Sequence, residues 1–243
     1  MNASPADQRR LVEVAQLDAR IRQADHARKN PPQAGRVQEL LGRRQELSQE
    51  LGTRLGARDD LRTELSRIES DVAVVDARAA RDAGRLAAST NSKEAQGLES
   101  ELAALARRKS DLEDAELAVM ERLEVADAAV AEQEALIAAT NAEGAELSAE
   151  GKRVVAEATA AFDAATRDRA AIAGGVSAEL LGLYDRLAVR SAGAAFLRRR
   201  TCEGCHMVLA GTDLQVLRQA GENDVVTCPE CGCILVRDDE SGL

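Results

Sequence analysis

Four cysteines near the C-terminal end have the spacing of a metal site. Cys202 and Cys205 form one Cys-x-x-Cys pair, and Cys228 and Cys231 form a second pair after 22 intervening residues (206–227). Two tight turns can each supply two thiolates, and Zn²⁺ binds four of them in a tetrahedron, each at about 2.3 Å. The sequence therefore predicts one structural zinc ion bound by these four side chains.

Other interpretations of the same residues explain less of the sequence. The stretch "CEGCH" at 202–206 is also a haem-attachment pattern, but that interpretation leaves the second pair without a role. A thioredoxin-like redox pair would need a βαβ context, which is absent. His206 could replace a cysteine ligand, although four cysteines already complete the shell. Four thiolates leave no open position for water, so we expect a structural and not a catalytic ion.

A fifth cysteine, Cys233, follows the second pair directly. We interpret it as a partly buried strand residue, and the alternative is a thiol active in metal exchange or redox chemistry. All five cysteines lie in the last 42 residues of the chain (202–243). In a reducing compartment, clustered cysteines favour metal ligation over disulfides.

Short β-type runs surround the cysteine pairs, at 193–198, 224–227 and 234–236, with a helical turn expected at 212–220. This layout is typical of a zinc ribbon, which we assign to residues 192–243. A domain of this size has too small a core to fold without a staple such as zinc.

The rest of the chain is predicted to be helical. No proline occurs between Pro32 and Pro229, and the 243 residues contain no Trp, one Tyr and two Phe. Apolar residues recur at alternating steps of four and three, as in the seam of a coiled coil. The seam residues include Leu61, Leu65, Ile68, Val72 and Val75 in the first half, and Leu98, Leu102, Leu105, Leu112, Val119, Leu123, Val130 and Ile137 in the second.

The two seams are separated by a turn-forming stretch of Ser, Thr and Asn near 88–92, where Asn91 or Ser92 is the expected helix cap. We therefore predict a mainly α fold, in which a long antiparallel coiled-coil hairpin (1–175) precedes a connecting helix (176–191) and the small β zinc ribbon. Prolines at 31–32 and glycines at 144 and 151 lie at the same height of the hairpin. They predict a bend or break of both arms, near 30–32 and 144–151.

Charge and composition limit the possible functions. The formal net charge is −10, so the chain as a whole does not attract nucleic acid. There is no apolar run of 18 residues and no signal-peptide pattern, which predicts a cytoplasmic protein without a membrane segment. Basic residues are nearly all Arg, a bias typical of a GC-rich bacterial genome.

No nucleophile–base–acid set and no phosphate-binding loop is visible, so we expect neither an enzyme nor a small-molecule substrate. The favoured hypothesis is an adaptor or chaperone-like protein that binds a protein partner through the coiled coil, the zinc ribbon or both. The alternative is RNA or DNA binding through the ribbon and Arg198–Arg200. A second basic cluster, of Lys93, Arg107 and Arg108, is a candidate contact for an acidic partner near the hairpin turn.

The sequence resembles a family of bacterial proteins that combine a coiled-coil hairpin with a C4-type zinc ribbon. The resemblance is carried by "NSKE" at 91–94, "LLGLYDR" at 180–186, "CEGC" at 202–205 and "CPECG" at 228–232. It implies the fold described above. It also implies a binding or chaperone-like role linked to flagellar or type III export, to the enhancer-dependent sigma factor, or to RNA. Family members usually carry Arg where this chain has Cys233.

Overall fold

The structure, a computed structural model, describes residues 1–243. The chain divides into two compact units, one formed by Met1–Ala34 with Ala149–Leu243 and the other by Gly35–Ser148. Its elements, in chain order, are α1 (Pro5–Lys29), α2 (Ala34–Ala88), α3 (Ser92–Ala173), α4 (Ala178–Ala188), β1 (Ala194–Arg198), β2 (Thr201–Cys202), α5 (Gly211–Gln219), β3 (Val226–Thr227) and β4 (Ile234–Val236). No helix combines the length and the apolar character that crossing a bilayer requires.

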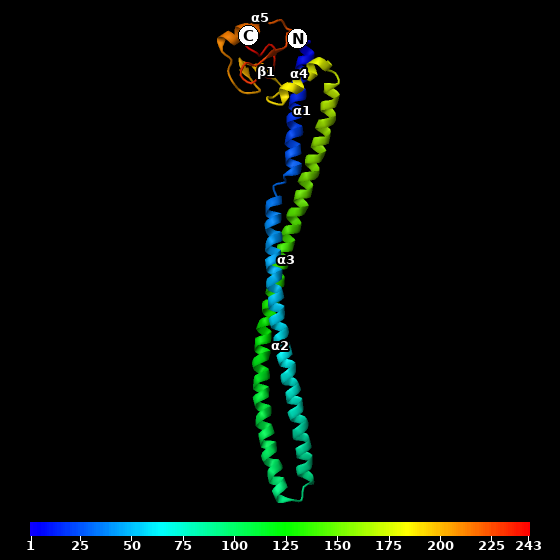
Figure 1. Ribbon diagram of the computed structural model, residues 1–243, viewed down its shortest axis with the longest axis vertical. Helices are drawn as coiled ribbons and strands as arrows, with labels where there is room; N and C mark the ends of the chain where they lie inside the picture. The colour runs from blue at the N-terminus through cyan, green and yellow to red at the C-terminus, as the bar shows by residue number, and fades with distance from the viewer. The chain divides into compact units, whose positions relative to one another are not determined.

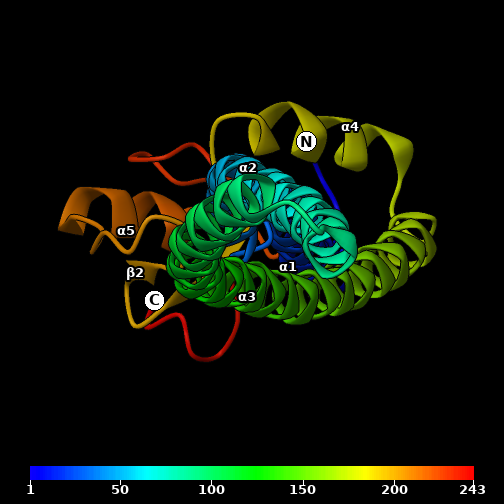
Figure 2. The same cartoon turned by 90° about the horizontal axis from the view of Figure 1, so that it is seen from below.

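The unit of residues 35–148 is an antiparallel helical hairpin, which confirms the predicted fold class. In this unit α2 and α3 lie side by side and twist around each other (Figures 1 and 2). One side chain in every second turn of α3 is buried in the seam, whereas the facing seam residues of α2 are mostly half-buried. The buried apolar side chains of α3 here are Leu98, Leu105, Leu112, Val119 and Val130.

The chain reverses between Ala88 and Ser92. Asn91 caps α3, because its side-chain oxygen accepts a hydrogen bond from the backbone N–H of Lys93 at 3.0 Å. Ser89 Oγ accepts a hydrogen bond from the backbone N–H of Asn91 at 3.3 Å. Short polar side chains therefore satisfy the backbone groups that the turn leaves without helical partners.

A buried polar side chain crosses the seam of the hairpin. Gln133 is 2% exposed, and its Nε2 donates a hydrogen bond of 2.9 Å to the backbone carbonyl of Leu47. A polar seam residue lowers stability but fixes the register of the two helices. Arg54 makes a similar bond in the opposite direction, from Nη1 to the carbonyl of Ala129 at 3.0 Å.

Replacing Gln133 with Leu is expected to stabilise the hairpin by about 1–2 kcal/mol, because an apolar layer replaces a desolvated amide. Gln133→Ala is the matched control and is expected to destabilise it by about 2 kcal/mol, because it loses the hydrogen bond and leaves a void. Thermal unfolding followed by far-UV circular dichroism measures both. A lower melting temperature for both variants would show that the hydrogen bond outweighs apolar packing at this layer.

The second arm has no break near 144–151. α1 and α2 are separated around Pro31 and Pro32, but α3 is helical without interruption through Gly144 and Gly151. A glycine costs a helix only about 1 kcal/mol and keeps its backbone N–H donor, whereas a proline loses the donor and clashes with the preceding turn. Gly151 does lie against the break of the first arm, since a Cβ there would be 3.8 Å from Cβ of Gln33.

The other unit contains a four-stranded sheet with the order β2-β1-β4-β3, in which β1 and β4 are parallel. Side chains alternate between its two faces, as in any strand. Ala194, Ile234 and Val236 pack with α1 and α4, whereas Ala195, Leu197 and Leu235 pack with α5. α4 and α5 therefore pack on opposite faces of this sheet, and the two helices lie apart in both views (Figures 1 and 2).

The zinc ribbon has a small core of its own on the α5 side of the sheet and shares a second core with the helices. One cluster joins its strands to Leu11, Val12 and Val14 of α1 and to Leu180 and Tyr184 of α4. The sequence divides residues 1–175 from residues 192–243, whereas the compact unit joins both ends of the chain. The physical reason is area, because a ribbon this small covers the apolar face of its sheet only by packing against helices.

A network of hydrogen bonds and salt bridges lies beside this shared core. The hydroxyl of Tyr184, which is 1% exposed, donates a 2.7 Å hydrogen bond to Oδ2 of Asp18. Arg169 bridges Asp18 and Asp185, with N–O distances of 2.8 and 3.0 Å. Burial and the Asp18 carboxylate raise the pKa of Tyr184, so the phenol remains a donor at all physiological pH values. These contacts join α1, α3 and α4 to one another.

Candidate metal centre

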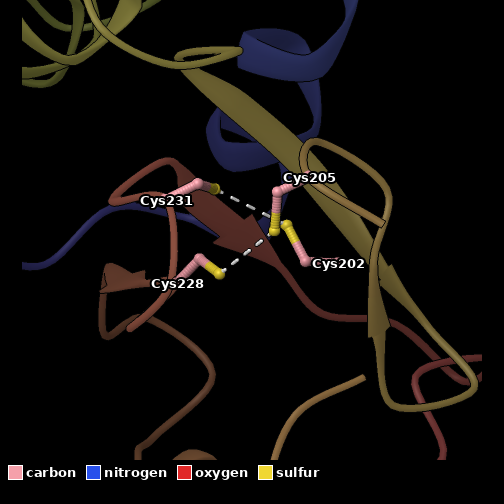
Figure 3. A group of neighbouring side chains, drawn as sticks. All are labelled: Cys202, Cys205, Cys228 and Cys231. Carbon is pink, nitrogen blue, oxygen red and sulfur yellow. Dashed lines mark hydrogen bonds between the residues drawn. The ribbon is translucent and has the colours of Figure 1, made fainter. Parts of the chain in front are cut away.

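Two turns bring the four predicted cysteines together (Figure 3). Cys202 ends β2, and Cys205 follows in a turn closed by a 2.7 Å hydrogen bond from the N–H of His206 to the carbonyl of Cys202. Cys228 follows β3, and a 2.9 Å bond from the N–H of Gly232 to its carbonyl closes the second turn. Gly232 has φ +76°, a conformation that is costly for residues with a side chain.

The thiols have the geometry of a tetrahedral zinc site. All four Sγ atoms lie within 4.8 Å of one another. Two of the distances are 4.0 Å, from Cys202 to Cys231, and 3.9 Å, from Cys205 to Cys228. Sulfurs at about 2.3 Å from a central Zn²⁺ would be about 3.8 Å apart, so the donor set fits the ion in type, number and spacing. The centre holds one structural zinc.

Burial and metal binding act in opposite directions on these thiols. Cys202 and Cys228 are buried, and Cys205 and Cys231 are half-buried. Burial raises the pKa of the Cys202 thiol to about 12. Zn²⁺ reverses this effect, because a thiol that coordinates the ion is deprotonated outright. The folded site and the ion therefore stabilise each other, and protons compete with zinc as the pH falls.

Cys233 contacts the centre without belonging to the group of four. Its Sγ lies 3.4 Å from Sγ of Cys231 and 3.6 Å from Sγ of Cys202, and the side chain is fully buried. Burial raises the pKa of this thiol. Gly204 of the first turn packs against it, since a Cβ at Gly204 would be 3.2 Å from this sulfur. Strand alternation in the sequence could indicate its burial but not these two contacts.

The three arginines before the first cysteine turn, Arg198–Arg200, have different environments in the structure. Arg198 is held by Asp238 at 2.7 Å and by Glu240 at 2.8 Å, and it stacks over the ring of Phe196. Arg199 and Arg200 are exposed and form the two-residue turn between β1 and β2, with φ of 48° and 66°. Their N–H groups donate to the carbonyls of Glu240 and Ser241, so the C-terminal segment holds the turn. His206 is exposed and is not among the four clustered ligands.

The second basic cluster lies on the first turns of α3. Lys93, Arg107 and Arg108 are all exposed. The neighbouring Lys109 instead pairs with Asp76 of α2 at 2.8 Å, which raises the pKa of Lys109. The hairpin therefore uses one basic residue of this region to join its helices and leaves the other three facing solvent.

Comparisons with known proteins cover nearly the whole chain. Residues 14–192 match the CT398-like coiled coil hairpin domain, and residues 201–235 match the C4-type zinc ribbon domain. The uncharacterized protein Rv2229c of Mycobacterium tuberculosis is 34% identical over 243 residues, which cover 98% of each chain. A solved structure from Mycobacterium smegmatis is 30% identical, with a TM-score of 0.78 over 98% of this chain and 100% of the other.

The hairpin match alone spans well over half of the chain, and the zinc ribbon match includes all four clustered cysteines. The match to the M. smegmatis structure covers 98% of this chain and therefore includes both the hairpin and the ribbon. The protein is therefore a zinc-binding coiled-coil protein, and it belongs to the family defined by a CT398-like coiled coil hairpin followed by a C4-type zinc ribbon.

Proposed function

We propose that the protein is a non-enzymatic adaptor that binds a helical segment of a protein partner on the outer face of its coiled-coil hairpin. The observation that carries the proposal is an apolar patch on α3. Leu117 and Met120 are 59% and 47% exposed and lie one helical turn apart, so their side chains are neighbours. Large apolar side chains that face solvent together mark interaction surfaces more often than singly exposed ones.

Charge around the patch indicates the character of the partner. Glu113, Glu121 and Glu124 are exposed and lie four residues before Leu117, four after it and seven after it, on the same helix face. An apolar pair with an acidic rim fits an amphipathic helix whose apolar stripe is bordered by Lys or Arg. Nothing at the closed zinc centre offers an open coordination position for catalysis, which supports a structural role for the ion.

The experiment places a photo-crosslinking amino acid at position 117 or 120 of the full-length protein in its native cells. Position 74 is the matched control, because Val74 is 64% exposed on α2 of the same hairpin. We expect the same partner protein to be crosslinked from 117 and 120 and not from 74, with and without nuclease. Equal labelling from all three positions would contradict the proposed surface.

A second candidate function is favoured by two exposed cations without a salt-bridge partner at the β1–β2 turn, Arg199 and Arg200, of which Arg200 donates one hydrogen bond of 3.3 Å from Nε to the carbonyl of Gly242. Arg198 and Arg237 do not add to this surface, because Arg198 pairs with acidic residues and Arg237 donates to four backbone carbonyls. Loss of co-purifying nucleic acid from an Arg199→Glu, Arg200→Glu variant, with crosslinking at 117 unchanged, would support nucleic-acid binding by the ribbon. The charge reversal Arg107→Glu, Arg108→Glu tests the cluster near the hairpin turn in the same way.

A further inference from the structure

Cys231 and Cys233 form a thiol pair at the edge of the zinc centre. Their sulfurs are 3.4 Å apart, which is close to van der Waals contact, and only Gly232 separates them in sequence. Cys231 is a clustered zinc ligand and is half-buried, whereas Cys233 is fully buried and lies outside the group of four. A small solute can therefore reach Cys231, and Cys233 can react only through its neighbour.

A cavity of about 550 Å³ opens onto Cys231. Cys231 and Gly232 form one part of its wall, and Arg186, Val189 and Arg190, at and just beyond the end of α4, form another. No carboxylate lines the cavity, and neither Arg186 nor Arg190 forms a salt bridge. Two cations in this wall favour the approach of an anion, or of a group that leaves as an anion, to the Cys231 sulfur.

We propose that Cys231 and Cys233 are a peroxide-reactive site, in which a hydroperoxide oxidises Cys231 and Cys233 then forms a disulfide with it, releasing the zinc. The inference concerns the zinc centre itself and does not depend on the proposed partner surface. The proposal rests on two features that a simple four-cysteine centre lacks. These are the fifth thiol, Cys233, in contact with Cys231, and the cavity with two arginines beside Cys231.

The chemistry proceeds in two steps. The Cys231 thiolate attacks hydrogen peroxide, so that an S–O bond forms, the O–O bond breaks and hydroxide leaves; sulfur loses two electrons and the peroxide gains them. Cys233 then attacks the Cys231 sulfur of the sulfenic acid, so that an S–S bond forms and the S–O bond breaks. The Cys233 proton leaves with the oxygen as water. One thiolate, one thiol and one H₂O₂ thus give one disulfide, one water and one hydroxide.

Zinc release follows from the loss of a ligand. A disulfide sulfur is neutral and no longer binds the ion as a thiolate does, so three thiolates remain where a closed structural site has four. The product is recoverable, because a thiol reductant restores both cysteines. Without Cys233 the sulfenic acid has no neighbour outside the coordination shell, and further peroxide converts it to sulfinic acid, which reductants do not restore.

The test uses the zinc-loaded full-length protein with hydrogen peroxide and a chromogenic zinc chelator. Trypsin cleavage after Arg200, Arg218 and Arg237 places Cys202 and Cys205 in one peptide and Cys228, Cys231 and Cys233 in another. We expect zinc release to parallel the appearance of a disulfide inside the peptide 219–237, which fragmentation assigns to Cys231 and Cys233. Dithiothreitol with added zinc should then restore nearly all of the bound metal.

Cys233→Ser and Cys233→Ala are the test variants, and each is first checked for one zinc per chain. In both, the fraction of zinc binding that dithiothreitol restores is expected to fall below about one tenth, because sulfinic acid accumulates. Arg186→Gln with Arg190→Gln should slow zinc release at the same peroxide concentration and leave the product unchanged.

Three results would overturn the proposal. The first is a disulfide that forms initially between two of the four ligands or between Cys202 and Cys233. The second is equal recovery of the wild type and both Cys233 variants after peroxide. The third is failure of both Cys233 variants to hold zinc before peroxide is added, because that would place Cys233 in the coordination shell.

Discussion

Replacing Cys228 with Ser is expected to remove the zinc and unfold the ribbon. Cys228 is buried and belongs to the group of four thiols, and a serine hydroxyl is not a thiolate donor. Structural zinc contributes about 10–16 kcal/mol of apparent binding free energy in small zinc domains, so the loss of one ligand exceeds what a core of this size can offset. A stoichiometric zinc assay should therefore find much less than one ion per chain.

The loss of zinc is also expected to extend into α1. Ile234 and Val236 of β4 share a core with Leu11 and Val14, so a disordered sheet leaves these helix residues without their packing partners. Hydrogen exchange should accelerate at the amides of residues 11–17. It should remain unchanged around Leu112 and Val119, which are buried in the separate hairpin unit.

Cys233→Ala is the matched control for this prediction, because it removes a buried thiol that is not among the four ligands. We expect it to retain one zinc and slow exchange in α1. If Cys228→Ser keeps a full complement of zinc, or if α1 stays protected without it, then the ribbon is less dependent on the metal than its small core indicates.

Replacing Gly193 with Ala is expected to destabilise the unit that contains the ribbon by more than about 4 kcal/mol, which is exceptional for a single substitution. Gly193 has φ +74°, a conformation that L-residues adopt at a cost of about 1 kcal/mol or more. A Cβ there would also lie 2.4 Å from Cε2 of Tyr184, well inside van der Waals contact. The tyrosine cannot move away freely, because its hydroxyl is bound to Asp18.

Gly52→Ala provides a control of opposite sign. Gly52 lies within α2, where a Cβ would meet nothing within 4 Å, so the substitution should stabilise the hairpin by about 0.5–1 kcal/mol. Denaturant unfolding monitored through Tyr184 fluorescence reports the ribbon unit, since this is the only tyrosine and there is no Trp, and far-UV circular dichroism of the long helices reports the hairpin. A loss of less than about 1 kcal/mol in Gly193→Ala would show that α4 shifts to accommodate the methyl group.

The position of the hairpin turn and the composition of the metal centre follow from local sequence. The turn near 88–92 is specified by short polar residues that compete for backbone partners, and Asn91 caps α3 without help from distant residues. The four cysteines are recognisable because metal geometry requires two closely spaced donors in each turn. The coiled-coil seam can be predicted from the sequence because helix geometry sets the spacing of its apolar residues.

Other features depend on tertiary contacts and have no local signal. A glycine can end a helix or lie in its interior, and the local sequence does not distinguish the two cases. The helix α3 continues through Gly144 and Gly151 because neither residue removes a backbone N–H donor. The basic triplet appears uniform in sequence, yet only Asp238 and Glu240, forty residues or so later, determine that Arg198 is neutralised and Arg199 is not.

The sequence by itself determined that the protein has a helical hairpin and a zinc ribbon, because both depend on regular spacing within short stretches. Only the tertiary structure decided that the ribbon shares its core with α1 and α4, and that Cys233 contacts Cys202 and Cys231. The physical reason is that burial and thiol contact are properties of surfaces brought together from distant parts of the chain. Spacing along the chain specifies which residues can form an element, and packing specifies which of them meet.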